Sequence, residues 1–590
     1  LEPGDYVVHI NHGIGRYRGL AKIPVQGTER EFLLVQYDGN DKLYVPTDQI
    51  DRLQKYIGSE GNAPSVHKLG GTEWLKATAK AQRQAKEIAG DLVKLYATRQ
   101  ASERPTYSDE NPWLREMEDA FPYVETDDQL QAVEDIIQDL QAPKPMDRLI
   151  CGDVGFGKTE VAMRAAFKVA TEGRQVAVLC PTTILAAQHF QTFTKRLGAF
   201  PICIDMVSRF RSPKEQAKTI EAAKHGVADI VIGTHRLLSK DVSFKNLGLV
   251  IVDEEQRFGV IHKERLKQLK NQVDVITLSA TPIPRTLHMA LTGIRDMSVI
   301  NQAPEGRIPV KTYVKSHDDG LIKEAILREV DRGGQVYYLH NRVNSIDQIA
   351  FHLSRNVVPG IRVRVAHGQM TEDALEDVMV DFYNKAFDVL VCTTIVESGL
   401  DVPNVNTIII DNADRFGLAQ LYQLRGRVGR SRQQAYAYLL TPRSKSVRDV
   451  AEQRLDALRE FSDLGSGYKI ALRDLELRGA GNLLGSEQHG MVAAVGFDLY
   501  CQLLENAIHE AKGEPIEELT FNMPGVDLPV VATIPEKYIK AEPQRILMYK
   551  KLAACRSRLD VAHVQEEFED RYGDPPPPVW NALALLRLRM

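Results

Sequence analysis

The sequence has 590 residues, of which 43% are hydrophobic and 26% charged, with six cysteines and a formal net charge of -5 at pH 7. This length exceeds one ordinary hydrophobic core and this apolar fraction excludes overall disorder, so we expect several folded domains. The net charge excludes a globally basic surface, so any nucleic acid must bind in a local groove. The cysteines never approach CxxC spacing, which argues against a zinc site or a disulfide framework.

The apolar runs and the two ends of the sequence bear on location. No apolar run approaches the roughly 18 residues of a membrane span, and the first residues lack the basic and apolar regions of a secretory signal. We therefore predict a cytoplasmic protein without membrane contact. The sequence starts with Leu1 and ends on NALALLRLRM, which resembles an unfinished helix, so we interpret the chain as a piece of a longer protein.

Residues 1–60 are predicted to form a small β-domain. Two apolar runs, FLLVQY and KLYVP, flank a turn signal at Asp38, Gly39 and Asn40, and VVHI earlier in the chain alternates as a strand does. This segment has too little apolar surface to be a catalytic core.

Residues 61–115 are predicted to be a linker that contains a long helix. The stretch from Thr72 to Arg99 is rich in Ala, Lys, Gln and Leu and has no Pro. Ile88, Leu92 and Leu95 fall on one helical stripe within it.

Residues 116–310 and 311–442 alternate short apolar runs with helical stretches. The runs are RLICGD, QVAVLCP, ADIVIGT, LGLVIVDEE and VDVITLSAT in the first part, and QVYYLH, RVRVAHG, FDVLVCTT, NVNTIIIDN and AYAYLL in the second. Such runs suit strands that are buried on both faces of a parallel sheet, so we predict two α/β lobes in tandem. A segment of about 443–490 is rich in Gly and Arg, and it begins a separate predicted region, 443–512. Residues 513–590 resemble part of a further domain, with a stiff loop predicted at Pro575 to Pro578.

The strongest chemical signal is the segment GDVGFGKT, between an apolar run and a helical stretch. It consists of Gly152, Asp153, Val154, Gly155, Phe156, Gly157, Lys158 and Thr159. Glycines at this spacing let backbone N–H groups turn toward phosphate oxygens, Lys158 reaches the β- and γ-phosphates, and Thr159 binds Mg²⁺. The segment therefore predicts an ATP-binding loop, and the alternative is a glycine-rich turn without a chemical role.

Asp253 and Glu254 end a buried apolar run in VIVDEEQRFG. Paired carboxylates are costly there unless they meet a cation, so we predict that Asp253 holds Mg²⁺ and that Glu254 orients and deprotonates the attacking water. The alternative is a solvated strand end.

Two further segments are assigned to the nucleotide only in combination with the loop. The Gln129 amide is able to read the adenine edge, and Phe121 is able to stack on the base, although each is more often a surface amide or a core aromatic. In QLYQLRGRVGRS, Arg425, Arg427 and Arg430 are too many guanidinium groups to bury without anionic partners. We predict Arg427 and Arg430 as arginine fingers, and a solvated basic helix is the alternative.

Over residues 116–442 the sequence resembles superfamily 2 helicases and translocases. The matching blocks, in the family's order, are ETDDQLQAV, GDVGFGKT, PTTILAAQH, GTHRLL, VDEEQRFG, LSATPIPRT, HGQM, TTIVESGLDVPN and QLYQLRGRVGR. The resemblance implies two RecA-like parallel-sheet lobes that use ATP and Mg²⁺. It also implies three groups of residues: coupling by Ser279, Ala280 and Thr281, approach to the DNA backbone by Thr182 and Thr234, and contact of the second lobe with nucleotide and strand by Glu397, Gly399 and Asp401.

The residues DEEQ stand where other families of this superfamily have DEAD or DEAH. Together with the block GLAQLYQLRGRVGR, they narrow the resemblance to RecG and the transcription-repair coupling factors, which both move on duplex DNA. The segment LRDLELRGAGNLLGSEQHG is similar to a motif that forms a helical hairpin and a loop beside the DNA channel in this group. The resemblance implies that Arg473 and Arg478 bond to Gln488 or to lobe carbonyls and transmit lobe closure to the duplex. The alternative is an independent structural hairpin.

The N-terminal segment LEPGDYVVHINHGIGRYRGL resembles the CarD-like, Tudor-type β-barrel of the coupling factors rather than the wedge domain of RecG. This module binds the β subunit of RNA polymerase, and a long helix then leads to the motor. A C-terminal α+β domain is matched only in part. Leu20 and Ile23 are our candidates for the polymerase contact, although a Leu at that spacing is more often a core residue.

This resemblance implies the second half of a coupling factor, without the modules that recruit UvrA. The expected function is ATP-dependent translocation on double-stranded DNA that displaces a stalled RNA polymerase and couples transcription to nucleotide excision repair. A RecG-like enzyme that remodels branched DNA is one alternative. A scaffold whose ATPase is only a binding switch is another.

Overall fold

The structure is a computed structural model. It describes residues 1–25, 28–56, 64–100, 104–108, 112–255, 258, 273–280, 296–394, 402–429, 433–442, 449–461, 463–478, 494–513, 530–555 and 557–589. Contacts divide the chain into one unit of residues 1–93 and 475–590 and a second unit of residues 94–474.

The first unit begins with an antiparallel sheet in the order β4-β3-β2-β1-β5. Its elements are β1 (Tyr6–His9), β2 (Gly13–Val25), β3 (Thr28–Gln36), η1 (Asp38–Asn40), β4 (Lys42–Pro46), η2 (Thr47–Arg52) and β5 (Leu53–Lys55). The predicted strands are confirmed. The turn signal between β3 and β4 forms η1, where Gly39 has φ +74°, a left-handed conformation that glycine adopts without strain.

The helices of the first unit come from both ends of the chain. They are α1 (Thr72–Gln100, ending in the second unit), α16 (Phe497–Lys512), α17 (Glu542–Ala554), α18 (Arg558–Tyr572) and α19 (Pro577–Arg589). The long helix is thus confirmed. Its fully buried stripe is Ala81, Ala85 and Ala89, whereas Ile88 is only half-buried. The side chains of Leu92 and Leu95 lie outside the described residues.

The stiff loop predicted at Pro575 to Pro578 is wrong in its second half. Pro577 begins α19, and Pro578 follows it in the first turn. Proline is tolerated there because the first N–H groups of a helix have no partner within the helix. The described residues of 530–589 form helices and connecting segments only.

The β-domain and the C-terminal helices share one hydrophobic core. Tyr17 and Leu33 of the sheet pack in the same buried cluster as Ile546 of α17. Buried Tyr549 of α17 donates a hydrogen bond to the buried carboxylate of Glu31 at 2.5 Å. Two regions far apart in the sequence therefore stabilise each other within this unit.

The first lobe of the second unit is a parallel sheet in the order β12-β6-β11-β10-β7-β9-β8. Its strands are β6 (Asp147–Gly152), β7 (Gln175–Leu179), β8 (Ile204–Val207), β9 (Ile230–Gly233), β10 (Leu247–Asp253), β11 (Asp274–Ser279) and β12 (Asp296–Ile300). The described helices are α2 (Pro112–Asp119), α3 (Asp127–Gln141), α4 (Lys158–Thr171), α5 (Thr183–Leu197), α6 (Pro213–His225) and η3 (His235–Leu238).

The second lobe is a parallel sheet in the order β13-β18-β17-β14-β16-β15. Its strands are β13 (Lys311–Ser316), β14 (Gln335–Leu339), β15 (Val363–Ala366), β16 (Val389–Cys392), β17 (Val405–Ile410) and β18 (Tyr436–Thr441). The described helices are α9 (Asp319–Asp331), α10 (Val343–His352), η5 (Leu353–Val357), α11 (Glu372–Tyr383), η7 (Ala413–Arg415), α12 (Leu418–Arg425), α13 (Asp449–Glu460) and α14 (Gly467–Arg478).

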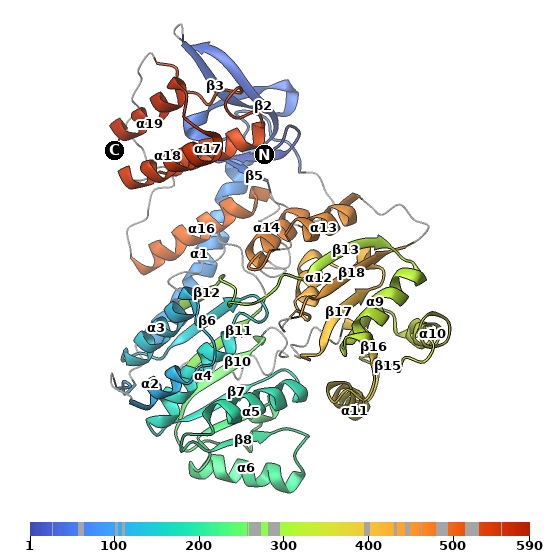
Figure 1. Ribbon diagram of the computed structural model, residues 1–590. Coiled ribbons are helices and arrows are strands. Elements are labelled where there is room, and N and C mark those ends of the chain that lie inside the picture. The colour runs from blue at the N-terminus through green and yellow to red at the C-terminus, as the bar shows by residue number, and fades with distance from the viewer. Residues whose placement is uncertain are drawn as a thin grey trace. The chain divides into compact units, whose positions relative to one another are not determined.

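The two predicted α/β lobes are thus confirmed, and each has its sheet packed against helices (Figure 1). Their buried strands form separate apolar cores. Among the described helices, none has the length and apolar character needed to cross a membrane.

Candidate active site

The predicted phosphate loop connects β6 to α4. Gly155 and Gly157 have φ +79° and +82°, in the left-handed region that favours glycine. A Cβ on Gly157 would lie only 2.3 Å from Nε2 of Gln129, so a side chain at this position would displace that amide. The loop therefore keeps its backbone exposed at the first turn of α4, the geometry that binds phosphate.

Lys158 lies across the loop. Its Nζ donates hydrogen bonds to the carbonyl oxygens of Gly152 at 2.6 Å and Asp153 at 2.9 Å. Burial lowers the pKa of Lys158 to about 8, against the opposing effect of nearby carboxylates, chiefly Glu254 and Asp253. The ammonium is thus held by carbonyl oxygens at the place where phosphate oxygens are expected.

Asp253 ends β10 and Glu254 follows it, and both line the same cavity as this lysine. Glu254 is buried, and its φ of +52° is unusual for a residue with a side chain and costs on the order of 1–3 kcal/mol. Its Oε1 accepts a hydrogen bond from the backbone N–H of Ala280 at 3.3 Å, and its own N–H donates to the carbonyl of Leu278 at 3.0 Å. The Glu254 carboxylate is thereby held at Ala280. The predicted coupling residues Ser279 and Ala280 are both buried.

His189 also belongs to this site, although it was not predicted from the sequence. Nε2 of His189, on α5, lies 2.9 Å from Oδ2 of Asp253. This histidine stands in the block PTTILAAQH, but nothing in its spacing indicates a carboxylate partner from another strand.

A cavity of about 410 Å³ joins the two lobes at this point. Lys158, Thr159, Asp253 and Glu254 line it from the first lobe, and Arg427 lines it from the second. The structure therefore brings these five predicted residues to one cavity. Hydroxyl and carboxylate oxygens beside two cationic side chains fit a triphosphate with a hard divalent cation.

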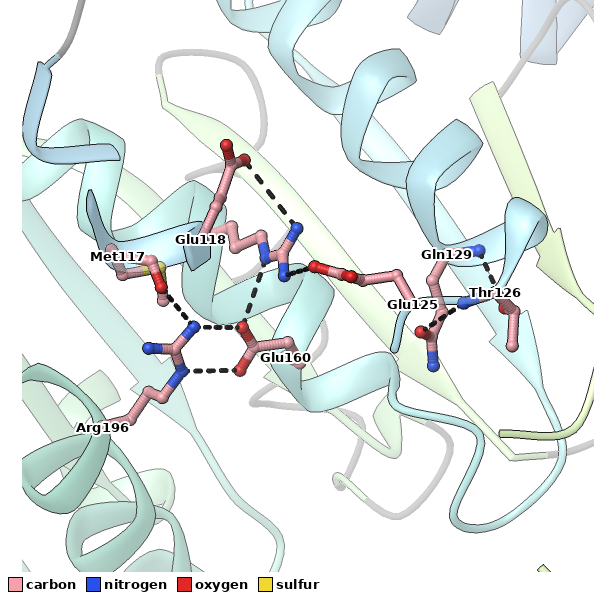
Figure 2. Close-up of polar contacts among 8 residues, drawn as sticks. Met117, Glu118, Glu125, Thr126, Gln129, Glu160 and Arg196 are labelled. Carbon is pink, nitrogen blue, oxygen red and sulfur yellow. Dashed lines mark hydrogen bonds and ion pairs between the residues drawn. The ribbon is translucent and has the colours of Figure 1, made fainter. Parts of the chain in front are cut away.

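The Gln129 side chain is buried and makes its hydrogen bonds within the protein. Its Nε2 donates a hydrogen bond to the carbonyl of Phe156 at 2.9 Å, and its Oε1 accepts one from the N–H of Thr126 at 3.1 Å. Figure 2 shows the second contact, which belongs to the capping box that starts α3. In this structure Gln129 fixes the phosphate loop, and reading of adenine stays a prediction.

Phe121 lies close to two guanidinium groups. The central carbons of Arg164 and Arg196 each lie 5.4 Å from its ring centroid. Glu160 links these arginines, at 3.2 Å from Arg164 and 3.0 Å from Arg196. Figure 2 shows its contact with Arg196. Glu125 also pairs with Arg164 at 2.5 Å. Stacking of Phe121 on a base stays a prediction.

The interpretation that all three arginines of QLYQLRGRVGRS need anionic partners is wrong for Arg425. This side chain is buried, but it donates hydrogen bonds to the carbonyl oxygens of Leu458 at 3.1 Å and Phe461 at 3.0 Å. Carbonyl dipoles therefore satisfy one guanidinium group, and Arg425 ties α12 to the end of α13. Arg427 is also buried, but it lines the shared cavity.

The residues predicted to approach DNA line a second cavity of about 480 Å³. Thr182 caps α5 by accepting a hydrogen bond from the N–H of Leu185, and Thr234 follows β9. Arg209 and Arg236 of the first lobe and Glu376 on α11 of the second line the same cavity. The cavity lies at the carboxyl ends of β7 and β9, where open parallel sheets commonly bind ligands.

The remaining predicted residues divide into two groups. Arg473 lies half-buried on α14, and Leu20 and Ile23 are half-buried on β2, with Leu20 packed against the core of the first unit. The following lie outside the described residues: Thr281, Glu397, Gly399, Asp401, Arg430, Gln488 and the side chain of Arg478.

Family models match four parts of the chain. Residues 126–290 match the DEAD/DEAH box helicase, and residues 319–432 match the helicase conserved C-terminal domain. Residues 1–57 match the CarD-like/TRCF RID domain, and residues 528–590 match the TRCF domain.

Relatives match over nearly the whole chain. The transcription-repair-coupling factor of Bacillus subtilis (strain 168) is 54% identical over 579 residues, which cover 98% of this chain and 49% of the relative. That of Staphylococcus aureus (strain USA300) is 51% identical over 590 residues, covering 100% and 50%. A solved structure of RecG bound to a three-way DNA junction has a TM-score of 0.62 at 35% identity, covering 73% of this chain and 57% of that chain.

The two parallel-sheet lobes and the cavity between them define the class: this is a helicase-type ATPase of superfamily 2 with RecA-like lobes. Within that class, the chain belongs to the family of transcription-repair-coupling factors. It spans about half the length of the curated relatives it matches.

Proposed function

We propose that this chain is an ATP-dependent translocase on double-stranded DNA that binds stalled RNA polymerase and displaces it, coupling transcription to nucleotide excision repair. The observation that carries the proposal is the cavity that collects Lys158, Asp253 and Glu254 from one lobe and Arg427 from the other. A nucleotide held there contacts both lobes, so its hydrolysis changes the distance or angle between them.

Each side chain has a role in this chemistry. Lys158 and Arg427 neutralise phosphate charge, and Thr159 and Asp253 supply the oxygens that would hold Mg²⁺, which neutralises phosphate charge further when bound. Glu254, fixed by the Ala280 N–H, orients the attacking water and accepts its proton. Arg430 is proposed as a second finger by the family resemblance.

DNA is proposed to bind at the edge lined by Thr182 and Thr234. Hydroxyl groups and the guanidinium groups of Arg209 and Arg236 suit the phosphodiester backbone, which carries no base sequence. Translocation is therefore expected to be independent of sequence and to weaken strongly with salt.

The match to the CarD-like/TRCF RID domain supports the N-terminal sheet as the contact for the polymerase β subunit. Ile23 near the end of β2 suits this role better than Leu20, because Leu20 packs against the core of its own unit. Recruitment of UvrA is expected from segments of the longer relatives that this chain does not span.

A second candidate function is remodelling of branched DNA. The likeness to the structure of RecG bound to a three-way DNA junction supports this candidate. A fork-regression assay separates the two functions, because only the remodelling enzyme converts a model fork into a four-way junction efficiently.

The proposed function is tested by Lys158→Ala. We expect this variant to bind polymerase as the wild-type chain does, since the N-terminal sheet is unchanged, but to lose ATP-dependent release of a stalled polymerase from its template. Release is measured by electrophoretic separation of the stalled complex. Loss of binding and release together would contradict this division of labour.

A further inference from the structure

A contact on the phosphate loop is not explained by nucleotide binding. Asp153, the second residue of the loop, accepts a hydrogen bond from the hydroxyl group of Tyr422 on α12. Its other carboxylate oxygen lies against Gly467, where a Cβ would come within 2.0 Å of it. Gly467 is the first residue of α14, so one carboxylate touches α12, which directly precedes the finger arginines, and the helix that carries Arg473.

The segment just before α14 also rests on the loop. Leu464 packs against the apolar cluster that contains Phe156. Gly465 has φ +79°, and a Cβ there would lie 2.5 Å from the carbonyl oxygen of Asn301. A small cavity of about 40 Å³ is lined by this segment, Asp153 and Phe156. The start of α14 thus contacts the loop at two residues, Asp153 through Gly467 and Phe156 through Gly465.

The loop is also held by the segment that connects the two lobes, between β12 and β13. Arg307 donates a hydrogen bond to the carbonyl of Val154 at 2.6 Å and lies over the ring of Phe156 at 5.3 Å. Lys158 donates to the carbonyl of Asp153 at 2.9 Å. Phosphate oxygens compete for this ammonium, so nucleotide binding removes a hydrogen bond from the residue whose side chain touches α12 and α14.

We infer that Tyr422 and Gly467 are positioning residues. Through their contacts with the Asp153 carboxylate they transmit a movement of the phosphate loop to α14. The carboxylate lies at the N-terminal end of α14, where the helix carries partial positive charge and favours an anion. A shift of Asp153 therefore moves or tilts α14, and with it Arg473. This inference rests on the proposed function, in which α14 leads to the segment beside DNA.

Two variants test the inference without altering the groups that bind nucleotide. Tyr422→Phe removes only the hydroxyl group, and Gly467→Ala places a methyl group where the carboxylate lies. We expect ATPase activity without DNA, and the KM for ATP, to stay within about twofold of the wild type, while DNA stimulation of kcat falls about tenfold, a coupling change of ordinary size. The distance translocated per ATP hydrolysed falls with it.

Matched controls are Tyr313→Phe on the edge strand β13 and Gly90→Ala in α1, where a Cβ would meet nothing within 4 Å. Both are expected to behave as wild type. Thermal unfolding of each variant reports folding, and if Gly467→Ala is destabilised the Tyr422→Phe result decides.

Unchanged DNA stimulation and translocation in both variants would overturn the inference. A raised KM for ATP with loss of basal activity would also overturn it, since the contact would then serve nucleotide binding itself. Failure of the wild-type chain to translocate at all is a different result, and it counts against the proposed function instead.

Discussion

At the residue scale, the buried charges of the second lobe are organised by Asp411, which follows β17. Its carboxylate lies 2.8 Å from Nδ1 of His340 and 3.2 Å from Nδ1 of His317, and Nε2 of His340 lies 2.7 Å from the Ser345 hydroxyl. Burial alone would raise the pKa of Asp411, but hydrogen bonds from His317 and His340 outweigh it and hold this pKa well below its usual value of 3.8.

A lowered carboxylate pKa gives a stability that is fully present above the unfolded pKa, near 3.8, and is lost as the pH falls through the folded value. We predict that Asp411→Asn lowers the local free energy of unfolding at pH 7 by about 1–3 kcal/mol, because the amide cannot accept both charge-assisted hydrogen bonds. The difference in local stability between Asp411→Asn and the wild type is expected to shrink below about pH 4. There the Asp411 carboxylate of the wild type begins to lose its stabilising effect.

Amide hydrogen exchange of β14 and β17 measures this local stability. The control is Asp381→Asn, because the pair of Asp381 with Arg364 is exposed and contributes little. Equal protection of β17 in Asp411→Asn and the wild type at pH 7 would show that the histidines do not depend on this carboxylate.

Local sequence patterns were sufficient for part of the site at this scale. The phosphate loop and the carboxylates Asp253 and Glu254 stand in short motifs whose flanking strands and helices are recognisable. His189, Tyr422 and Gly467 were missed, because each acts through a partner distant in the sequence; Tyr422 and Asp153 are 269 positions apart. Such pairings are set by strand order and not by local spacing.

At the element scale, α11 presents acidic side chains to the first lobe. Asp373 lies 3.7 Å from Arg209, and Glu376 is buried in the cavity that also contains Thr182 and Thr234. Burial raises the pKa of Glu376, against the opposing effects of Arg209 and Thr183. A phosphodiester bound at this edge therefore meets an acidic side chain from the other lobe.

We predict that Glu376→Gln strengthens binding of duplex DNA without nucleotide by about fivefold, as expected when about 1 kcal/mol of repulsion is removed. Fluorescence anisotropy with a labelled duplex at fixed salt measures the change. Asp377→Asn is the control, because it makes the same charge change at an exposed position of α11. Weaker binding, or equal gains in both variants, would contradict a specific role for Glu376.

Within the two lobes, the strands that the sequence did not indicate share one property. β8 and β12 are the two edges of the first sheet, and β13 is an edge of the second. An edge strand has one neighbour and is often partly exposed, so it lacks the continuous apolar run that marked the central strands. In β13 the pattern KTYVKS is exposed or half-buried throughout. The apolar runs thus indicated the central strands of both lobes and one edge strand, β15, but not the other three edge strands.

At the scale of the whole molecule, no sequence pattern indicated that the β-domain and the C-terminal helices form one core. Both were expected as small separate modules, yet Tyr17 and Leu33 share a cluster with Ile546 and Tyr549. Contacts between the first and last parts of a chain depend on the complete fold. The likeness to coupling factors identifies the modules but carries no contacts between them.

The central claim is that one cavity, with Lys158 and Glu254 on one lobe and Arg427 on the other, converts ATP hydrolysis into movement along DNA. The most direct test is displacement of a third strand from a triplex on linear duplex DNA. We expect ATP-dependent displacement of the third strand by the wild-type chain. We expect none by Arg427→Ala, which keeps the phosphate loop intact. Hydrolysis of ATP by the wild-type chain without displacement would contradict the account and indicate a nucleotide-driven binding switch instead.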